Sequence, residues 1–155
     1  MSKVKTILVP VDGSENSERA LLKAKEIADC LGSKIIMLNV INVRSSVSYY
    51  HSNARLAQDT AALDWPAIVK KVRSDSQAML DKAKKVMEGS EVEAVMLDEP
   101  GGDLAHTIVE FADERDVDMI VMGSNGMGSL KRRLYMGSVT TKVLHITEKP
   151  VLVIQ

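Results

Sequence analysis

A glycine-rich segment in the last third of the chain carries the residues best suited to hold a ligand. Residues 123–129 read GSNGMGS, with three glycines within six residues, and Gly137-Ser138 follows further along. A glycine has no Cβ, so its backbone N–H can approach an oxyanion closely, and successive amides in such a turn form an anion-binding concavity. Ser138 is expected to cap a helix, whose unpaired first amides and positive dipole end also favour an anion. Together the two features predict a cradle for a phosphate chain.

Each feature also has a purely structural interpretation. Asn125-Gly126 is typical of a tight turn, and Ser138 is typical of an ordinary helix cap. The segment is not a Walker P-loop, because Ser129 occupies the lysine position, and its glycine order does not fit the dinucleotide-binding fingerprint. The combination of glycine turn and helix start nevertheless favours a phosphate site over two unrelated structural features.

Three further stretches accompany the glycine segment. They open the chain, lead into the glycines and close the chain: residues 7–14 (ILVPVDGS), 117–124 (VDMIVMGS) and 149–154 (KPVLVI). With these stretches, nearly the whole chain resembles the universal stress protein family. ATP-binding members carry Gly, two residues, Gly, nine residues, and then Gly with Ser or Thr, a motif that Gly123, Gly126, Gly137 and Ser138 resemble. Here ten residues separate Gly126 from Gly137, which predicts a one-residue bulge within residues 127–129.

The resemblance implies a site for an adenine nucleotide. The ligand it implies is ATP, with AMP and ADP as alternatives, and it leaves open whether Mg²⁺ or Mn²⁺ accompanies the nucleotide. It places the Asp12 carboxylate near the ribose or a bound metal ion, and the backbone of Val40 toward the adenine. The nucleotide-binding residues that it implies are Pro10, Val11, Asp12, Val40, Gly123, Ser124, Gly126, Gly137, Ser138, Val139 and Thr140. It implies a protein that acts in the stress response by binding rather than by catalysis.

Strand and helix patterns alternate along the chain. Apolar runs predict strands at 6–11, 34–41, 92–97, 119–122 and 150–154, and helical spacing of apolar residues predicts helices at 15–31, 66–89, 102–115 and from 138 onward. In the last helix Val139, Val143, Leu144 and Ile146 are expected to face inward. This alternation predicts a single-domain α/β fold, a doubly wound five-stranded parallel sheet with helices on both faces. The resemblance implies strand order 3-2-1-4-5, and residues 42–64 predict an irregular insertion.

Composition narrows the class of partner. The chain has 155 residues, 45% of them hydrophobic and 26% charged, and a formal net charge of −1, which provides no bulk attraction to nucleic acid or acidic lipid. No apolar run approaches the ~20 residues that span a bilayer. Cys30 is the single cysteine, expected near the core on a helix, and a lone cysteine suits a reducing compartment. With no leader-like pattern at Met1, these features predict a cytoplasmic protein without nucleic-acid or membrane partners.

Three other functional classes have to be distinguished from a nucleotide-binding protein. The histidines His51, His106 and His145 lack ligand-like spacing, so a catalytic centre is not predicted, although slow ATP hydrolysis remains open. A phospho-accepting receiver domain is disfavoured because Asp12 lacks an acidic neighbour. A nucleotide-free dimeric interaction module is the remaining alternative. The strand at 151–154 is apolar on both faces, and an unpaired edge of this kind invites association, so we expect a homodimer paired through this strand.

Overall fold

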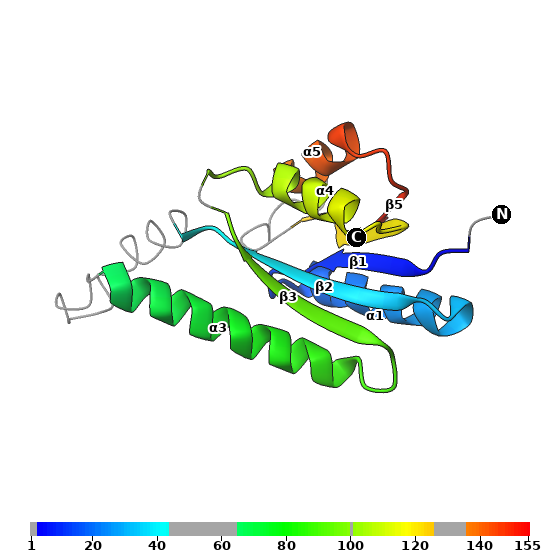
Figure 1. The fold of residues 1–155 in the computed structure, drawn as a ribbon, viewed down its shortest axis with the longest axis horizontal. Coiled ribbons are helices and arrows are strands. Elements are labelled where there is room, and N and C mark those ends of the chain that lie inside the picture. The colour runs from blue at the N-terminus through cyan, green and yellow to red at the C-terminus, as the bar shows by residue number, and fades with distance from the viewer. Residues whose placement is uncertain (1–2, 44–64, 100, 126–135) are drawn as a thin grey trace.

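The computed structural model describes residues 3–43, 65–99, 101–125 and 136–155, in which parallel strands alternate with helices (Figure 1). The elements in chain order are β1 (Thr6–Pro10), α1 (Glu15–Leu31), β2 (Lys34–Ile41), α3 (Trp65–Val86), β3 (Val92–Asp98), α4 (Leu104–Glu114), β4 (Met119–Gly123), α5 (Ser138–Ile146) and β5 (Val151–Ile154). The strands form one parallel sheet in the order β3-β2-β1-β4-β5. The predicted fold class and strand order are therefore confirmed.

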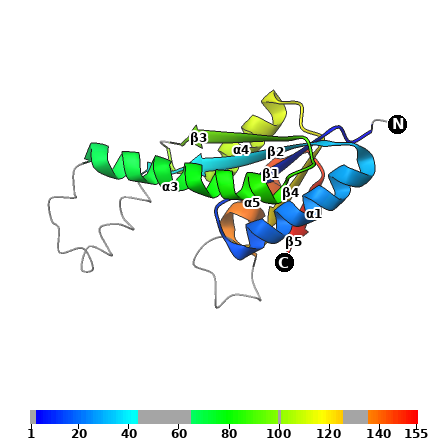
Figure 2. The ribbon, with the colours of Figure 1, turned by 90° about the horizontal axis from the view of Figure 1, so that it is seen from below.

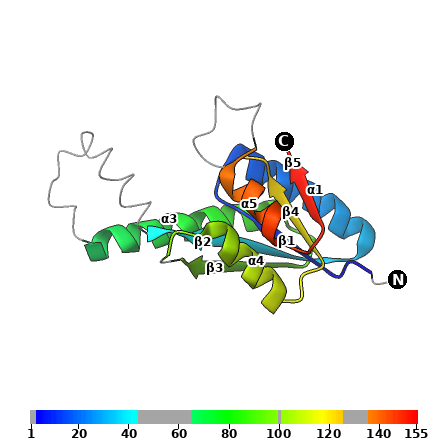
Figure 3. The same ribbon diagram turned by 90° about the horizontal axis from the view of Figure 1, so that it is seen from above.

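Helices cover both faces of the sheet. α1 and α3 lie against one face (Figure 2), and α4 and α5 lie against the other (Figure 3). Alternate strand residues enter the two cores: Ile7 and Val9 of β1 pack toward α1 and α3, whereas Leu8 packs toward α4 and α5. Both faces are buried, which explains why the central strands are almost continuously apolar in sequence.

The sheet reverses its strand order at β1. This strand pairs with β2 on one side and with β4 on the other. The chain leaves β1 for α1 on one face and leaves β4 for α5 on the opposite face. A crevice at the carboxyl ends of strands, where the order reverses, is the usual ligand site of such sheets.

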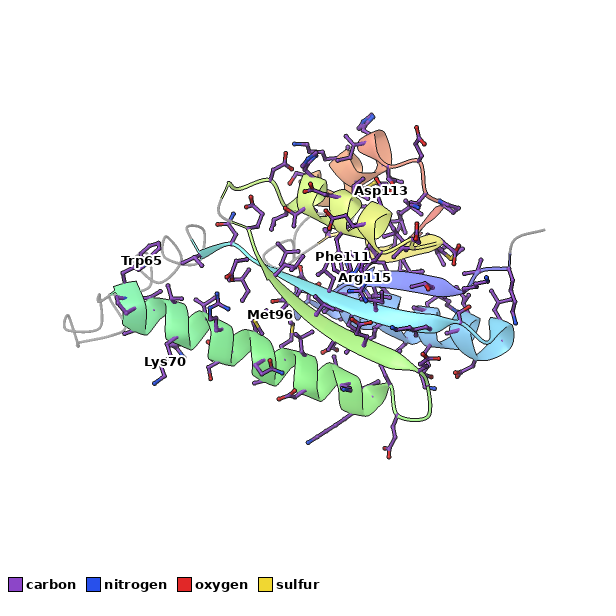
Figure 4. All side chains as sticks on the ribbon, viewed as in Figure 1. Trp65, Lys70, Met96, Phe111, Asp113 and Arg115 are labelled. Carbon is purple, nitrogen blue, oxygen red and sulfur yellow. The ribbon has the colours of Figure 1, made fainter. Side chains whose placement is uncertain are left out.

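Hydrophobic packing also reaches β3, the edge strand beside β2. Met96 of β3 lies between the sheet and α3 (Figure 4), where it packs against a small cluster of Ile41, Ile68 and Val72. Phe111 of α4 is buried on the opposite face, with the Arg115 guanidinium 5.3 Å from its ring centroid. The first contacts hold β3 against α3 near the carboxyl ends of the strands, and Phe111 and Arg115 anchor the C-terminal end of α4 near their amino ends.

Several details differ from the sequence-based expectations. α4 begins at Leu104 rather than 102, because the Asp103 side chain caps it by accepting a hydrogen bond from the His106 N–H. Leu144 and Ile146 are 41% and 39% exposed, so the expectation that both face inward is wrong. The nine-residue α5 buries only Thr140 and Val143, since it contacts the protein along a narrow stripe. Cys30 lies on α1 as expected but is exposed.

Some predicted features lie outside the described residues, namely most of the insertion at 42–64 and the bulge at 127–129. Of the helices in the described ranges, none is long and apolar enough to cross a membrane.

Candidate functional site

The turn after β1 presents Asp12 at the carboxyl edge of the sheet. Pro10 ends the strand, and Val11, which is buried, continues the ladder by donating its N–H to the Leu38 carbonyl at 2.8 Å. The Asp12 side chain is exposed, and its Oδ1 accepts the Ser14 N–H at 2.9 Å. Gly13 has φ +81°, a left-handed conformation that favours glycine. The turn therefore holds a carboxylate at the position where the resemblance implies ribose or metal.

The end of β2 offers backbone groups beside this turn. Parallel strands direct the N–H and C=O of alternate residues to the same side, and the Leu38 carbonyl bonds toward β1. Val40 lies two residues after Leu38, so its N–H and C=O point to the same side of β2. They lie beyond Pro10, the last residue of β1, which is paired with Leu38. The Val40 side chain packs in the core on the α4 and α5 face. Val40 is thus both a core valine and a residue whose backbone faces the crevice.

Asn39 is a further residue beside the site that the sequence motifs do not identify. It is buried, and its Nδ2 donates to the Val11 carbonyl at 2.8 Å, taking the place of a ladder bond where β1 leaves the sheet. Its Oδ1 has no hydrogen-bond partner in the described part of the chain. The available signal was one amide residue inside the apolar run of β2, because buried polar side chains normally serve a specific bond.

The end of β4 and the start of α5 are tied together by hydrogen bonds. The Gly123 carbonyl accepts the Thr140 hydroxyl at 2.9 Å, and the Ser124 carbonyl accepts the Gly137 N–H at 2.7 Å. The Ser124 N–H donates to the Ile154 carbonyl at 2.8 Å, which joins the same turn to β5. Four of the predicted site residues therefore come together through short contacts, whereas Gly126 lies outside the described residues.

The N-terminus of α5 differs from the prediction in its cap. Gly137, not Ser138, is the N-cap, with extended backbone angles (φ −62°, ψ 155°) and no side-chain capping bond. The expectation that Ser138 caps the helix is therefore wrong, because Ser138 already occupies the first helical position. The first turn of an α-helix leaves its amides without intrahelical partners. Here no cap side chain competes for those of Ser138, Val139 and Thr140, so they remain suited to an anion.

A pair of opposite charges links α4 to α5 close to this helix start. Lys142 Nζ lies 2.6 Å from Asp103 Oδ2. The Lys142 ammonium, and next the His106 backbone N–H, lower the pKa of the Asp103 carboxyl below its usual range. This half-exposed pair connects the cap of α4 to the second turn of α5.

Metal-binding groups are sparse in the same region. Within the described ranges, no group of three or more His, Cys, Asp or Glu side chains could hold a metal ion. Asp12 is the acidic side chain that the β1 turn brings to the crevice.

Comparisons with known proteins agree with this architecture. The model of the universal stress protein family matches residues 3–155, and the chain belongs to this family. The universal stress protein MJ0531 of Methanocaldococcus jannaschii is 33% identical over 153 residues, which cover 97% of this chain and 82% of that relative.

Solved structures show the same fold. UspA from Lactobacillus plantarum is 23% identical and superposes with a TM-score of 0.76 over 100% of both chains. The universal stress protein from Archaeoglobus fulgidus in complex with dAMP is 25% identical, with a TM-score of 0.65 over 99% of this chain and 100% of that chain. A relative of similar length and fold thus carries an adenine nucleotide.

Proposed function

We propose that this protein binds an adenine nucleotide, with ATP as the ligand, and acts in the cytoplasm as a regulatory module of the stress response. The observation that carries the proposal is the start of α5, which has no side-chain cap and is bonded to the glycine turn after β4. Backbone amides at such a position bind phosphate through hydrogen bonds and the helix dipole. The dAMP complex of the Archaeoglobus fulgidus relative supports the choice of an adenine nucleotide.

The other end of the crevice suits the nucleoside. The backbone of Val40 faces the space beyond β1, where its N–H and C=O could pair with the edge of adenine. The exposed Asp12 carboxylate is an acceptor for ribose hydroxyls. The nucleotide would then lie with its base at the end of β2, its ribose after β1 and its phosphates at the start of α5.

A divalent ion would enter with the nucleotide. Mg²⁺ is commonly bound by one or two carboxylates together with substrate phosphates and water. Asp12 fits this role, and Mg²⁺ or Mn²⁺ would offset phosphate charge there. We propose that function lies in binding, with any ATP hydrolysis slow and secondary.

Thermal unfolding with added nucleotide tests this proposal. At a hundredfold excess over its dissociation constant, ATP should stabilise the folded protein by about 2.7 kcal/mol. At about 2–4 °C per kcal/mol, the melting temperature should rise by roughly 5–10 °C. GTP is the control for the base, and mass spectrometry of retained nucleotide would identify the preferred ligand among ATP, ADP, AMP and cyclic AMP. An unchanged melting curve across millimolar ATP, with and without Mg²⁺, would instead favour the nucleotide-free interaction module.

We also propose a homodimer paired through β5. All four residues of this edge strand are apolar and only half-buried. Pairing two copies across a two-fold axis would cover the strand edge of both.

A further inference from the structure

Three consecutive carbonyl groups at the end of β4 each accept a hydrogen bond from a different residue. For residues 123, 124 and 125 in turn, the donors are the Thr140 hydroxyl at 2.9 Å, the Gly137 N–H at 2.7 Å and the Asn16 Nδ2 at 3.4 Å. The first two donors belong to the start of α5, and the third belongs to the first turn of α1. The described beginning of the glycine turn is therefore held from both faces of the sheet, and its contact with α1 is the longest of the three.

Close packing places Asn16 beside β4. A Cβ built on Gly123 would lie 2.8 Å from the Asn16 Cβ and 2.9 Å from the Asn16 carbonyl carbon. The first turn of α1 therefore rests directly on the backbone of Gly123. The half-buried Asn16 side chain consequently reaches over the end of β4 to the carbonyl of Asn125.

Arg19 determines which way the Asn16 amide faces. The Arg19 guanidinium donates to Asn16 Oδ1 and lies 3.1 Å from a carboxylate oxygen of Glu15, one turn back on α1. A guanidinium has donors and no acceptor, so the amide oxygen must face Arg19. The amide nitrogen is then left to donate to the Asn125 carbonyl. This bond holds Asn125, the last described residue of the turn, against the first turn of α1.

We infer that Asn16, oriented by Arg19, is a positioning residue for the phosphate site at the start of α5, because it holds the turn at residues 123–125 to which that helix start is bonded. This inference rests on the proposed nucleotide-binding function and concerns the same site. Arg19 and Glu15 are 46% and 80% exposed, so their ion pair contributes little to folding. Its effect should therefore appear in phosphate binding more than in the stability of the protein.

Two substitutions separate the steps of this arrangement. N16D keeps an acceptor for Arg19 but places a carboxylate, which cannot donate, against the Asn125 carbonyl. R19A keeps the Asn16 amide but removes the group that orients it, and R19K is the conservative variant. K23A is the matched control, because Lys23 forms a similar exposed pair with Glu26 further along α1.

The readout is the ratio of affinities for ATP and adenosine, measured by calorimetry with the melting temperature recorded for each variant. Losing one hydrogen bond should weaken ATP binding about fivefold. We expect that loss in N16D and R19A, partial recovery in R19K, no change in K23A, and adenosine affinity within about twofold throughout. Equal weakening of ATP and adenosine, or an unchanged ratio in N16D and R19A, would overturn the inference while leaving the proposed function intact. Failure of the wild-type protein to bind ATP would overturn both.

Discussion

Gly123 and Gly137 both lie in close contact with neighbouring atoms, but the neighbours differ. Gly123 lies against the backbone of α1, where an added Cβ would meet Asn16 atoms at 2.8 and 2.9 Å. An added Cβ at Gly137 would lie 3.1 Å from the Ser124 carbonyl oxygen, and φ there is −62°, which any residue adopts. Gly123 is therefore required because α1 packs directly on its backbone. Gly137 lies where a ligand would approach the first amides of α5.

We predict that G123A and G137A differ in their cost to folding. In G123A the helix must move away from β4, so we expect a loss of about 1–3 kcal/mol in the free energy of unfolding. In G137A the contact must open by only a few tenths of an ångström, so the loss should stay below about 1 kcal/mol. Urea unfolding of both variants measures the difference. Equal destabilisation would mean that α1 does not rest on β4 as closely as the structure indicates.

At the level of elements, ion pairs join helices to their neighbours near both ends of the strands. Asp103 of the α4 cap pairs with Lys142 of α5 at the carboxyl end. At the opposite end, the Arg115 guanidinium, followed by the Lys34 ammonium, lowers the pKa of the Glu93 carboxyl. Both carboxylates are more acidic when folded than when unfolded. Their contribution to stability is therefore present above the unfolded-state pKa and is lost as pH falls through the folded-state pKa.

We predict that K142M raises the pKa of Asp103, because it removes the group that lowers it most. In the wild-type protein the lowered pKa of Asp103 stabilises the fold above about pH 4, near the ordinary pKa of an aspartate. This stabilisation is lost at lower pH. K142M should therefore lose stability relative to wild type above that pH, and the difference should disappear in more acidic solution. NMR titration of the Asp103 carboxyl together with unfolding at several pH values checks this. A constant difference at all pH values would contradict the assignment.

Element type and order were predictable from the sequence, whereas several contacts at the site were not. Apolar periodicity indicates strands and helices because each must bury a face, and the parallel order followed from the family resemblance. The predicted cap of α5, Ser138, is one residue too late, since Gly and Ser both suit the cap position and only the backbone angles distinguish them. Asn16 and Asn39 bond to residues distant in sequence. The apolar run around Asn39 indicates that its amide is buried, but no local pattern identifies the partner of either side chain.

For the whole molecule, the two edges of the sheet differ in character. β3 carries charged side chains near both ends, Glu93 paired with Lys34 and Arg115, and Asp98 paired with Arg73. Charged side chains on an edge strand discourage pairing with another chain. β5 is Val-Leu-Val-Ile throughout. Association through a strand edge is therefore expected at β5.

The hydrogen bonds of β5 indicate which of its residues would pair with a second copy. The Pro150 carbonyl accepts the Ile120 N–H at 2.9 Å, and the Ile154 carbonyl accepts the Ser124 N–H at 2.8 Å. Because alternate residues of a strand direct their backbone groups to the same side, Leu152 also faces β4, and Val151 and Val153 face the outer edge.

We predict that V153P separates the dimer without unfolding the subunit. Proline removes an outward N–H and is tolerated on an edge strand, while the bonds from β5 to β4 are kept. A two-fold dimer would lose this donor in both copies, so its dissociation constant should rise by about tenfold or more. V153T is the control, because threonine has nearly the same shape and keeps the N–H. Analytical ultracentrifugation over micromolar concentrations, with circular dichroism to confirm folding, would measure the effect. A wild-type protein that sediments only as a monomer, or a folded V153P variant that dimerises like V153T, would exclude β5 as the dimer interface.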